Sequence, residues 1–196
     1  MKRTDISAGA ILLLSIIYFF GGFSSLCALL TAISVHETGH IAAILVCGGT
    51  VHKMRFGVSG LCIDCSGLNG TAAQIISLLA GCTFGLLLAY TASYFGNLTQ
   101  NTLLIKTAGF SLVLSIYNIL PALPLDGGRA LQCALNRLLG IERTDKVLDI
   151  LGVITGAVLL FSGAVYIRTQ FGPALLIAGI WVLIAQTGIV KSLCVM

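Results

Sequence analysis

The sequence predicts an all-α integral membrane protein with about six transmembrane helices, formed by one polytopic domain over residues 1–196. Of these residues 57% are hydrophobic and 9% are charged, whereas a soluble domain carries about 25% charged residues. Apolar stretches run from Ile6 almost to the C-terminus, so no separate soluble domain is expected. The few basic residues also follow a pattern typical of membrane topology, as described below.

Six apolar stretches are candidates for membrane spans, since one crossing takes about 20 apolar residues. The first is short and is expected to end at Gly21–Gly22, and the fourth is expected to end at the prolines that begin with Pro121. The start of the chain is similar to a signal peptide, but it leads directly into another membrane stretch, so we expect a retained span. The six predicted spans are 7–21, 25–47, 71–95, 103–121, 147–167 and 172–191.

Charge placement gives the expected orientation. With a cytosolic N-terminus, nine of the eleven Lys and Arg residues fall in inner loops and ends, and only Lys106 and Arg168 fall outside. This is the distribution that the positive-inside rule describes. Both termini are therefore predicted to be cytosolic. The net charge of +4 then reflects topology, and no nucleic-acid partner is expected.

The stretch 51–66 is the one segment with a β-like pattern. Val51–Phe56 and Leu61–Cys65 flank the turn signal Gly57-Val58-Ser59-Gly60, which fits a short membrane-associated hairpin or an ordinary cytosolic loop. A strand edge would offer hydrogen bonds to an extended substrate. The pair Cys62 and Cys65 is weak support for a redox or metal site, because one such pair on a reducing face has little specificity.

The second span contains the sequence His36-Glu37-Thr38-Gly39-His40. Ionisable residues are expensive in hydrocarbon, so such residues in a span are functional candidates. Residues i and i+4 share one face of a helix, so both imidazoles could bind one metal ion with Glu37 beside it. His36 lies eleven positions before Cys47, hence about 16 Å from the cytosolic end of the span, and a water channel from the cytosol is expected.

Two His ligands and a water leave a tetrahedral zinc one protein ligand short. Asp64 and Asp126 are candidates, and Asp126 is better placed, because Pro121 and Pro124 interrupt the helix before it. Irregular backbone at membrane depth is tolerated only where protein or water covers it. The other reading of Asp126 is an interfacial residue at a helix end. Three further acids have the pattern of a solvated amphipathic surface: Glu142, Asp145 and Asp149.

The two motifs together resemble the site-2 protease family of intramembrane zinc metalloproteases. The second motif is Asn118-Ile119-Leu120-Pro121-Ala122-Leu123-Pro124-Leu125-Asp126-Gly127-Gly128-Arg129. The likeness is greatest to the bacterial subgroup that processes a sporulation sigma-factor precursor. One departure is the segment 80–85, which keeps the small residues of an A-G-P-x-x-N-like element but lacks its Pro and Asn. No C-terminal regulatory domain is expected.

This resemblance implies a function and a set of site residues. The expected activity is hydrolysis of peptide bonds within or near transmembrane segments of membrane-bound substrates, as in regulated intramembrane proteolysis. One zinc ion per chain would be bound by His36, His40 and Asp126, with Glu37 as general base and Asn118 positioning the substrate. The expected partners are a membrane-bound precursor, the lipid bilayer and a regulatory membrane protein. The expected location is a bacterial cell membrane, with the site open to the cytosol.

The resemblance also implies an arrangement of the spans. A catalytic core over about 25–129 would contain the three spans 25–47, 71–95 and 103–121, and the accessory helices would be 7–21, 147–167 and 172–191.

Two other functions use the same residues. One is a membrane zinc carrier or sensor without proteolysis, which has no need for Glu37. The other is a scaffold with a vestigial site, against which the complete ligand set argues.

Overall fold

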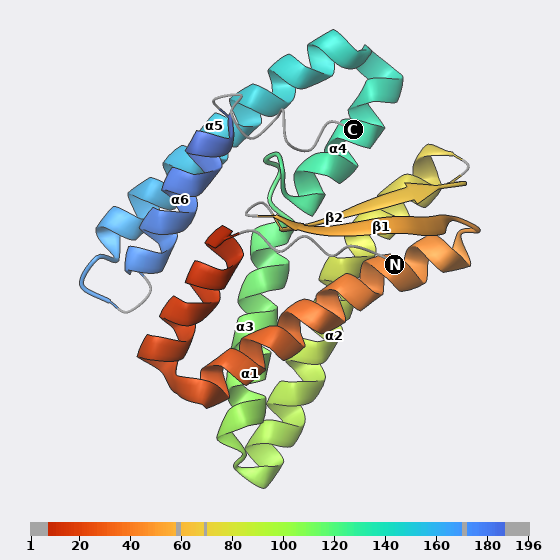
Figure 1. The fold of residues 1–196 in the computed structure, drawn as a ribbon. Helices are drawn as coiled ribbons and strands as arrows, with labels where there is room; N and C mark the ends of the chain where they lie inside the picture. The colour runs from red at the N-terminus through yellow and green to blue at the C-terminus, as the bar shows by residue number, and fades with distance from the viewer. Residues whose placement is uncertain (1–7, 58–59, 69, 170–171, 187–196) are drawn as a thin grey trace. The chain divides into compact units, whose positions relative to one another are not determined.

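A computed structural model describes residues 8–57, 60–68, 70–169 and 172–186. Within these ranges only the backbone is described for residues 8–20 and 53–65. The chain divides into two compact units, Met1–Asn118 and Ile119–Met196. The elements follow the order α1 (Ala8–Val46), β1 (Thr50–Gly57), β2 (Gly60–Ser66), α2 (Thr71–Thr99), α3 (Thr102–Asn118), α4 (Asp126–Leu139), α5 (Ile141–Val165) and α6 (Gly172–Gln186) (Figure 1).

The predicted helical membrane fold is confirmed. Among the described residues, three helices are long and apolar enough to cross a membrane: Gly21–Val46, Thr71–Thr99 and Ile141–Val165. The fourth and sixth predicted spans are shorter apolar helices, Thr102–Asn118 and Gly172–Gln186. The fourth stops three residues before Pro121, because the proline blocks continuation of the helix. The predicted positions 187–191 lie outside the described residues.

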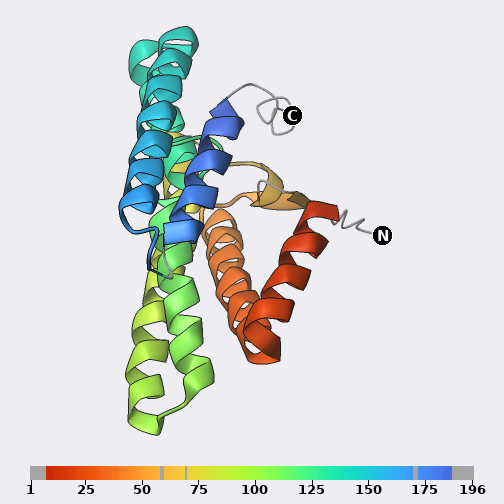
Figure 2. The same ribbon diagram turned by 90° about the vertical axis from the view of Figure 1, so that its left-hand side faces the viewer.

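The first two predicted spans are two arms of α1, which is kinked at Gly22. This residue has φ 72° and ψ 177°, a conformation that favours glycine because it has no Cβ. Figure 2 shows the two arms diverging from the kink as a V. Next to the kink, Lys106 Nζ of α3 donates to Ser24 Oγ at 2.9 Å and to Ser25 Oγ at 3.1 Å. The glycines at the end of the first span therefore set its direction.

The second arm of α1 packs with α2 and α3 around small residues. All three helices contact one another. Ala28 and Ala32 of α1 are fully buried, and Ser111 of α3 is buried as well. Ser111 Oγ donates to the carbonyl oxygen of Gly85 on α2 at 2.8 Å. Small residues allow close approach of helices in a membrane, where packing and interhelical hydrogen bonds stabilise association.

The segment after α1 is a β-hairpin, so the loop alternative is wrong. Strands β1 and β2 pair antiparallel, from Thr50 opposite Ser66 to Gly57 opposite Gly60. The register shifts between Val51 and Lys53, which leaves His52 as the extra residue of a bulge. His52 is exposed, and its Nε2 lies 2.6 Å from Ser66 Oγ. The His52 side chain thus makes a hydrogen bond across the two strands of the hairpin.

In the second unit, α5 and α6 run side by side through glycine contacts. A Cβ added at Gly163 of α5 would lie 2.8 Å from Leu176 of α6, and one at Gly179 of α6 would lie 2.9 Å from the backbone of Leu160. These glycines therefore set the close spacing of the two helices. The α5 helix begins at Ile141, six residues before the predicted span, because its first turns carry the charged residues that the apolar search excluded.

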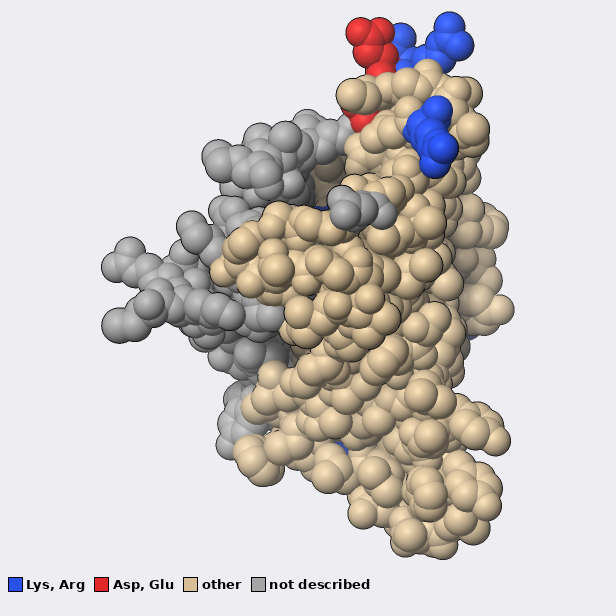
Figure 3. Space-filling model, turned by 90° about the vertical axis from the view of Figure 1, so that its right-hand side faces the viewer, with Lys and Arg blue, Asp and Glu red and all other residues tan. Residues whose placement is uncertain are grey.

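Helix α4 has no counterpart among the predicted spans. It is 14 residues long and amphipathic, so a search for apolar runs of about 20 residues does not detect it. It joins α5 at Gly140, which has φ 78°. Arg137, Glu142 and Arg143 near this corner are exposed. On the face in Figure 3, most of the described surface is uncharged, and the visible charged side chains gather mainly where Figure 1 has the α4–α5 corner.

Candidate metal centre

His36 and His40 lie on the buried face of α1. Buried residues recur on this arm every three or four positions, as the helical repeat requires, and they include Ala28, Ala32, His36, His40 and Ile44. The two histidines are 3% and 7% exposed, so they occupy core positions between apolar neighbours. A buried polar side chain needs a partner, because its desolvation is otherwise uncompensated. Both buried rings therefore need hydrogen-bond or metal partners.

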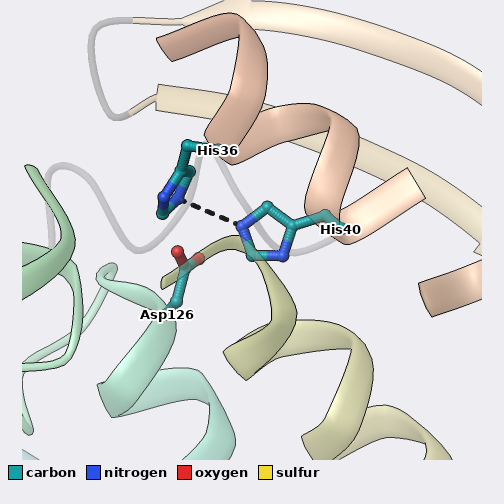
Figure 4. Close-up of side chains that lie close together, drawn as sticks. All are labelled: His36, His40 and Asp126. Atoms are coloured by element: carbon teal, nitrogen blue, oxygen red, sulfur yellow. Dashed lines mark hydrogen bonds between the residues drawn. The ribbon is translucent and has the colours of Figure 1, made fainter. Parts of the chain in front are cut away.

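The two imidazole rings converge on one point. His36 Nε2 and His40 Nε2 are 3.2 Å apart, and the rings meet edge to face with centroids 4.8 Å apart (Figure 4). Zinc–nitrogen bonds are about 2.0–2.1 Å, so two ligands of one tetrahedral zinc lie about 3.3 Å apart. The spacing of the Nε2 atoms fits this value.

The orientation of His40 is fixed from α2. His40 Nδ1 lies 2.7 Å from the carbonyl oxygen of Ser77, which can only accept, so Nδ1 carries the proton. His40 Nε2 is then the lone-pair nitrogen and is directed toward His36. Metal-binding histidines usually donate their second ring N–H in this way, which fixes the tautomer and raises ligand basicity.

Gly81 provides the space for the His40 ring. A Cβ at Gly81 would collide with three ring atoms of His40. Gly39 of α1 also lies close to α2, since a Cβ there would lie 2.8 Å from the carbonyl oxygen of Ala80. In the sequence, Gly81 is one of the small residues that segment 80–85 keeps. Its contact with a candidate ligand, and the role of the Ser77 carbonyl, were not predicted.

Glu37 follows His36 on α1 and is half-buried. It lies about 100° around the helix from His36, so it is off the buried face that contains both histidines. The next residue, Thr38, is exposed and returns its hydroxyl to the carbonyl of Val35 at 2.8 Å. The acid therefore lies between the buried imidazoles and the exposed side of the helix.

Asp126 is the first residue of α4 and follows an irregular loop, as the prolines predicted. In that loop the amide of Leu125 donates to the carbonyl of Ala122 at 2.9 Å. The glycines after Asp126 are required by close packing: a Cβ at Gly127 would collide with the carbonyl of Ile119, and one at Gly128 with that of Ala122. The first turn of α4 therefore lies directly on the loop.

Among the described residues, one His/His/Asp group could hold a metal ion, and it consists of His36, His40 and Asp126. Figure 4 draws these three side chains on α1 and α4. His nitrogen and carboxylate oxygen are both ligands that zinc accepts, and three protein ligands are typical of a catalytic site with one open position. The donor set predicted from the motifs is thus chemically suited to zinc.

The remaining predicted residues have separate environments. Asn118 ends α3, and its Nδ2 donates to the carbonyl of Leu114 at 3.1 Å, which leaves one N–H of that amide. Asp145 Oδ1 accepts from Gln132 Nε2 at 3.3 Å on the charged first turns of α5. The side chains of Asp64, Cys62 and Cys65 lie outside the described part of the structure, and both readings of the cysteine pair stay predictions.

Comparisons with known proteins bear on the fold. No protein-family model and no curated protein matches the sequence. A solved structure, a site-2 protease from Methanocaldococcus jannaschii, superposes with a TM-score of 0.70 at 16% sequence identity. The match covers 96% of this chain and 87% of the other. The chain therefore has the fold of a site-2 protease, as its two sequence motifs predicted.

Proposed function

We propose that this protein is an intramembrane zinc metalloprotease of the site-2 type. The observation that carries the proposal is the pair of buried imidazoles on an apolar helix, with Nε2 atoms 3.2 Å apart and Glu37 next to His36 in the sequence. Intramembrane ionisable residues are functional candidates by default, and this combination is the one that zinc peptidases use. The fold shared with a site-2 protease supports the same conclusion.

In this proposal His36, His40 and Asp126 bind one zinc ion per chain. When bound, zinc supplies Lewis-acid polarisation of the scissile carbonyl and lowers the pKa of water. The chain prepares its own ligands. The Ser77 carbonyl keeps the proton of His40 on Nδ1, and Gly81 leaves room for the ring. The hydrogen-bonded loop before α4 fixes the position of the Asp126 backbone, from which the carboxylate extends.

Glu37 is the proposed general base. It accepts a proton from the attacking water and passes it to the leaving amine, the two transfers that amide hydrolysis requires. Asn118 is proposed to donate its remaining N–H to the oxygen of the scissile carbonyl as negative charge develops there. A carbonyl hydrogen bond of this kind stabilises the transition state more than the bound substrate.

The proposed substrate is a transmembrane segment of another membrane protein, in its narrowest form the membrane-associated precursor of a transcription factor. Helix amides are bonded internally, so such a segment must unwind before cleavage. The edges of the β1–β2 hairpin could replace those hydrogen bonds by strand addition. We further propose a cytosolic opening of the site and control by a membrane partner, as in regulated intramembrane proteolysis.

The proposal is tested by Glu37→Gln, which keeps side-chain size but removes the base. Cleavage of a candidate membrane substrate should fall about 10²–10⁴-fold, while zinc content equals that of the wild-type protein. Thr38→Ala, at the neighbouring exposed position, is the matched control and should cleave normally. Near-normal cleavage by Glu37→Gln would refute the mechanism. If neither the wild-type protein nor Glu37→Gln cleaves the substrate and both transport zinc, the alternative of a membrane zinc carrier without proteolysis would be favoured.

A further inference from the structure

Gln186 is the last described residue of α6 and contacts the loop that leads into α4. Its Nε2 donates to the carbonyl oxygen of Leu123 at 2.8 Å, and more weakly to Val182 of its own helix at 3.4 Å. Leu123 precedes Asp126 by three residues. The two bonded residues are 63 positions apart in the chain. The contact therefore joins α6 to the loop near the start of the second unit.

The backbone of this loop needs such a donor. Two prolines interrupt it, so regular helical hydrogen bonds cannot satisfy all of its carbonyls. Unsatisfied backbone groups are costly in apolar surroundings, because no water is present to bond them. The Leu120 and Ala122 carbonyls accept from amides within the loop, at 2.9 Å each. The Leu123 carbonyl accepts instead from the Gln186 side chain.

A glutamine at this position is costly for the fold itself. Among the described residues, Gln186 Oε1 is buried and has no hydrogen-bond partner. A buried unsatisfied acceptor has lost its hydrogen bonds to water without replacement, and an apolar residue on this apolar helix would avoid that cost. Neighbouring Ala185 and Val182 are apolar and buried. Packing of α6 therefore does not explain the amide, whereas its bond to Leu123 does.

Helix α5 leaves a space for this side chain at Gly152. A Cβ at Gly152 would collide with the Gln186 amide group, which is the movable end of the side chain. One turn further on α5, a Cβ at Gly156 would lie 2.6 Å from Leu183 Cδ2 of α6. The two glycines thus belong to one helix interface, but only Gly152 contacts the amide.

We infer that Gln186 is a positioning residue for Asp126, and that α6 fixes the metal-binding end of α4 through the Leu123 carbonyl. This inference rests on the proposed function for the role of Asp126 as a zinc ligand. The accessory helix predicted from sequence would then be part of the support of the site. Loss of such outer support typically costs about 10–100-fold in metal affinity or activity.

The test uses two ways of breaking the bond. Gln186→Met keeps the length of the side chain and removes the donor, and Gly152→Ala displaces the amide without changing Gln186. Gly156→Ala is the matched control, since it crowds the same pair of helices at Leu183 and not at the Gln186 amide. Each full-length protein is purified in detergent. Hydrogen exchange of the peptide over 119–130 is measured without zinc, and zinc affinity is measured by competition with a chelator.

The first two variants should show faster exchange in 119–130 and about tenfold weaker zinc binding, with kcat lowered and KM nearly unchanged. Gly156→Ala should match the wild-type protein in all these measurements. Unchanged exchange or zinc affinity in Gln186→Met, or an equal effect of Gly156→Ala, would overturn the inference. Absence of zinc binding by the wild-type protein would instead overturn the proposed function, while the exchange comparison still decides whether Gln186 fixes the loop.

Discussion

At the residue scale, the orientation of the candidate ligand His40 depends on backbone groups and on a residue without a side chain. His40 is oriented by a backbone carbonyl of α2 and accommodated by a missing Cβ at Gly81. Such contacts make the ring a fixed ligand, because a buried imidazole with one donated N–H has a single tautomer. The chemistry of α1 is therefore controlled in part by α2.

Gly81→Ala should weaken zinc binding by about 10–100-fold, the range found when the support of a ligand is removed. The added methyl group occupies the position of the His40 ring, which must turn away from His36. Zinc affinity by chelator competition is the measurement. Gly109→Ala on α3, where a Cβ would meet nothing within 4 Å, is the control. Equal zinc affinity in both variants would contradict the assigned role.

The ligand set itself is tested by metal content. The wild-type protein should contain about one zinc per chain, since three protein ligands and one open position form one site. His36→Ala combined with Asp126→Ala should remove it. Elemental analysis of protein purified in mild detergent gives the stoichiometry. Full zinc occupancy in the double variant would rule out both residues as ligands.

At the element scale, helix association relies on small residues and a few hydrogen bonds. The bond from Ser111 Oγ to the Gly85 carbonyl joins α3 to α2 in a fully buried position. Interhelical hydrogen bonds in membranes contribute about 0.6 kcal/mol on average and about 1.7 kcal/mol at most. This single bond is therefore expected to contribute only a small part of the association of α2 and α3.

Ser111→Ala should accordingly lower the free energy of unfolding by about 0.6 kcal/mol, since it removes one interhelical bond and leaves no cavity larger than a hydroxyl group. Thr91→Ala is a suitable control, because the Thr91 hydroxyl bonds only to carbonyls of its own helix. Denaturation in mixed detergent gives both values. A loss above about 2 kcal/mol would mean that the Ser111 bond has a larger role than packing suggests.

At the scale of the whole molecule, the predicted topology has the hairpin and the α4–α5 corner on the cytosolic side. Cysteines introduced into a cysteine-free protein at Leu138, which is 77% exposed, should react from the cytosol. A cysteine at the exposed Asn97, after α2 has crossed, should react from outside. The reason is the distribution of nine basic residues inside and two outside. Reaction of position 138 from outside would contradict this topology and indicate the inverted one.

The native Cys133 is a poorer probe of the same corner. Burial raises the pKa of its thiol, because the thiolate is the form that loses solvation. Only the thiolate reacts with maleimides, so labelling at neutral pH should be slower at Cys133 than at Leu138→Cys. The rate at Cys133 should rise as pH increases toward 9 and above. Equal rates at neutral pH would contradict the burial of this thiol.

Local patterns in the sequence determined the class of the protein and its principal residues. Apolar length predicted the membrane helices, Gly21–Gly22 predicted the end of the first span, where α1 is kinked, and Pro121 predicted the end of α3 and the irregular loop. The spacing of His36 and His40 predicted a shared helix face, which the structure confirms. These features follow from periodicity and backbone chemistry within a few residues, so no tertiary information was needed.

Only the tertiary structure decided what surrounds those residues. It selected the hairpin over a loop for 50–66, because strand pairing depends on a partner segment, and it showed the amphipathic helix α4. The bond from His40 to Ser77 joins residues 37 apart, and that from Gln186 to Leu123 joins residues 63 apart. A local pattern contains no record of such contacts, since they arise only when helices pack and bring distant backbone groups within hydrogen-bonding distance.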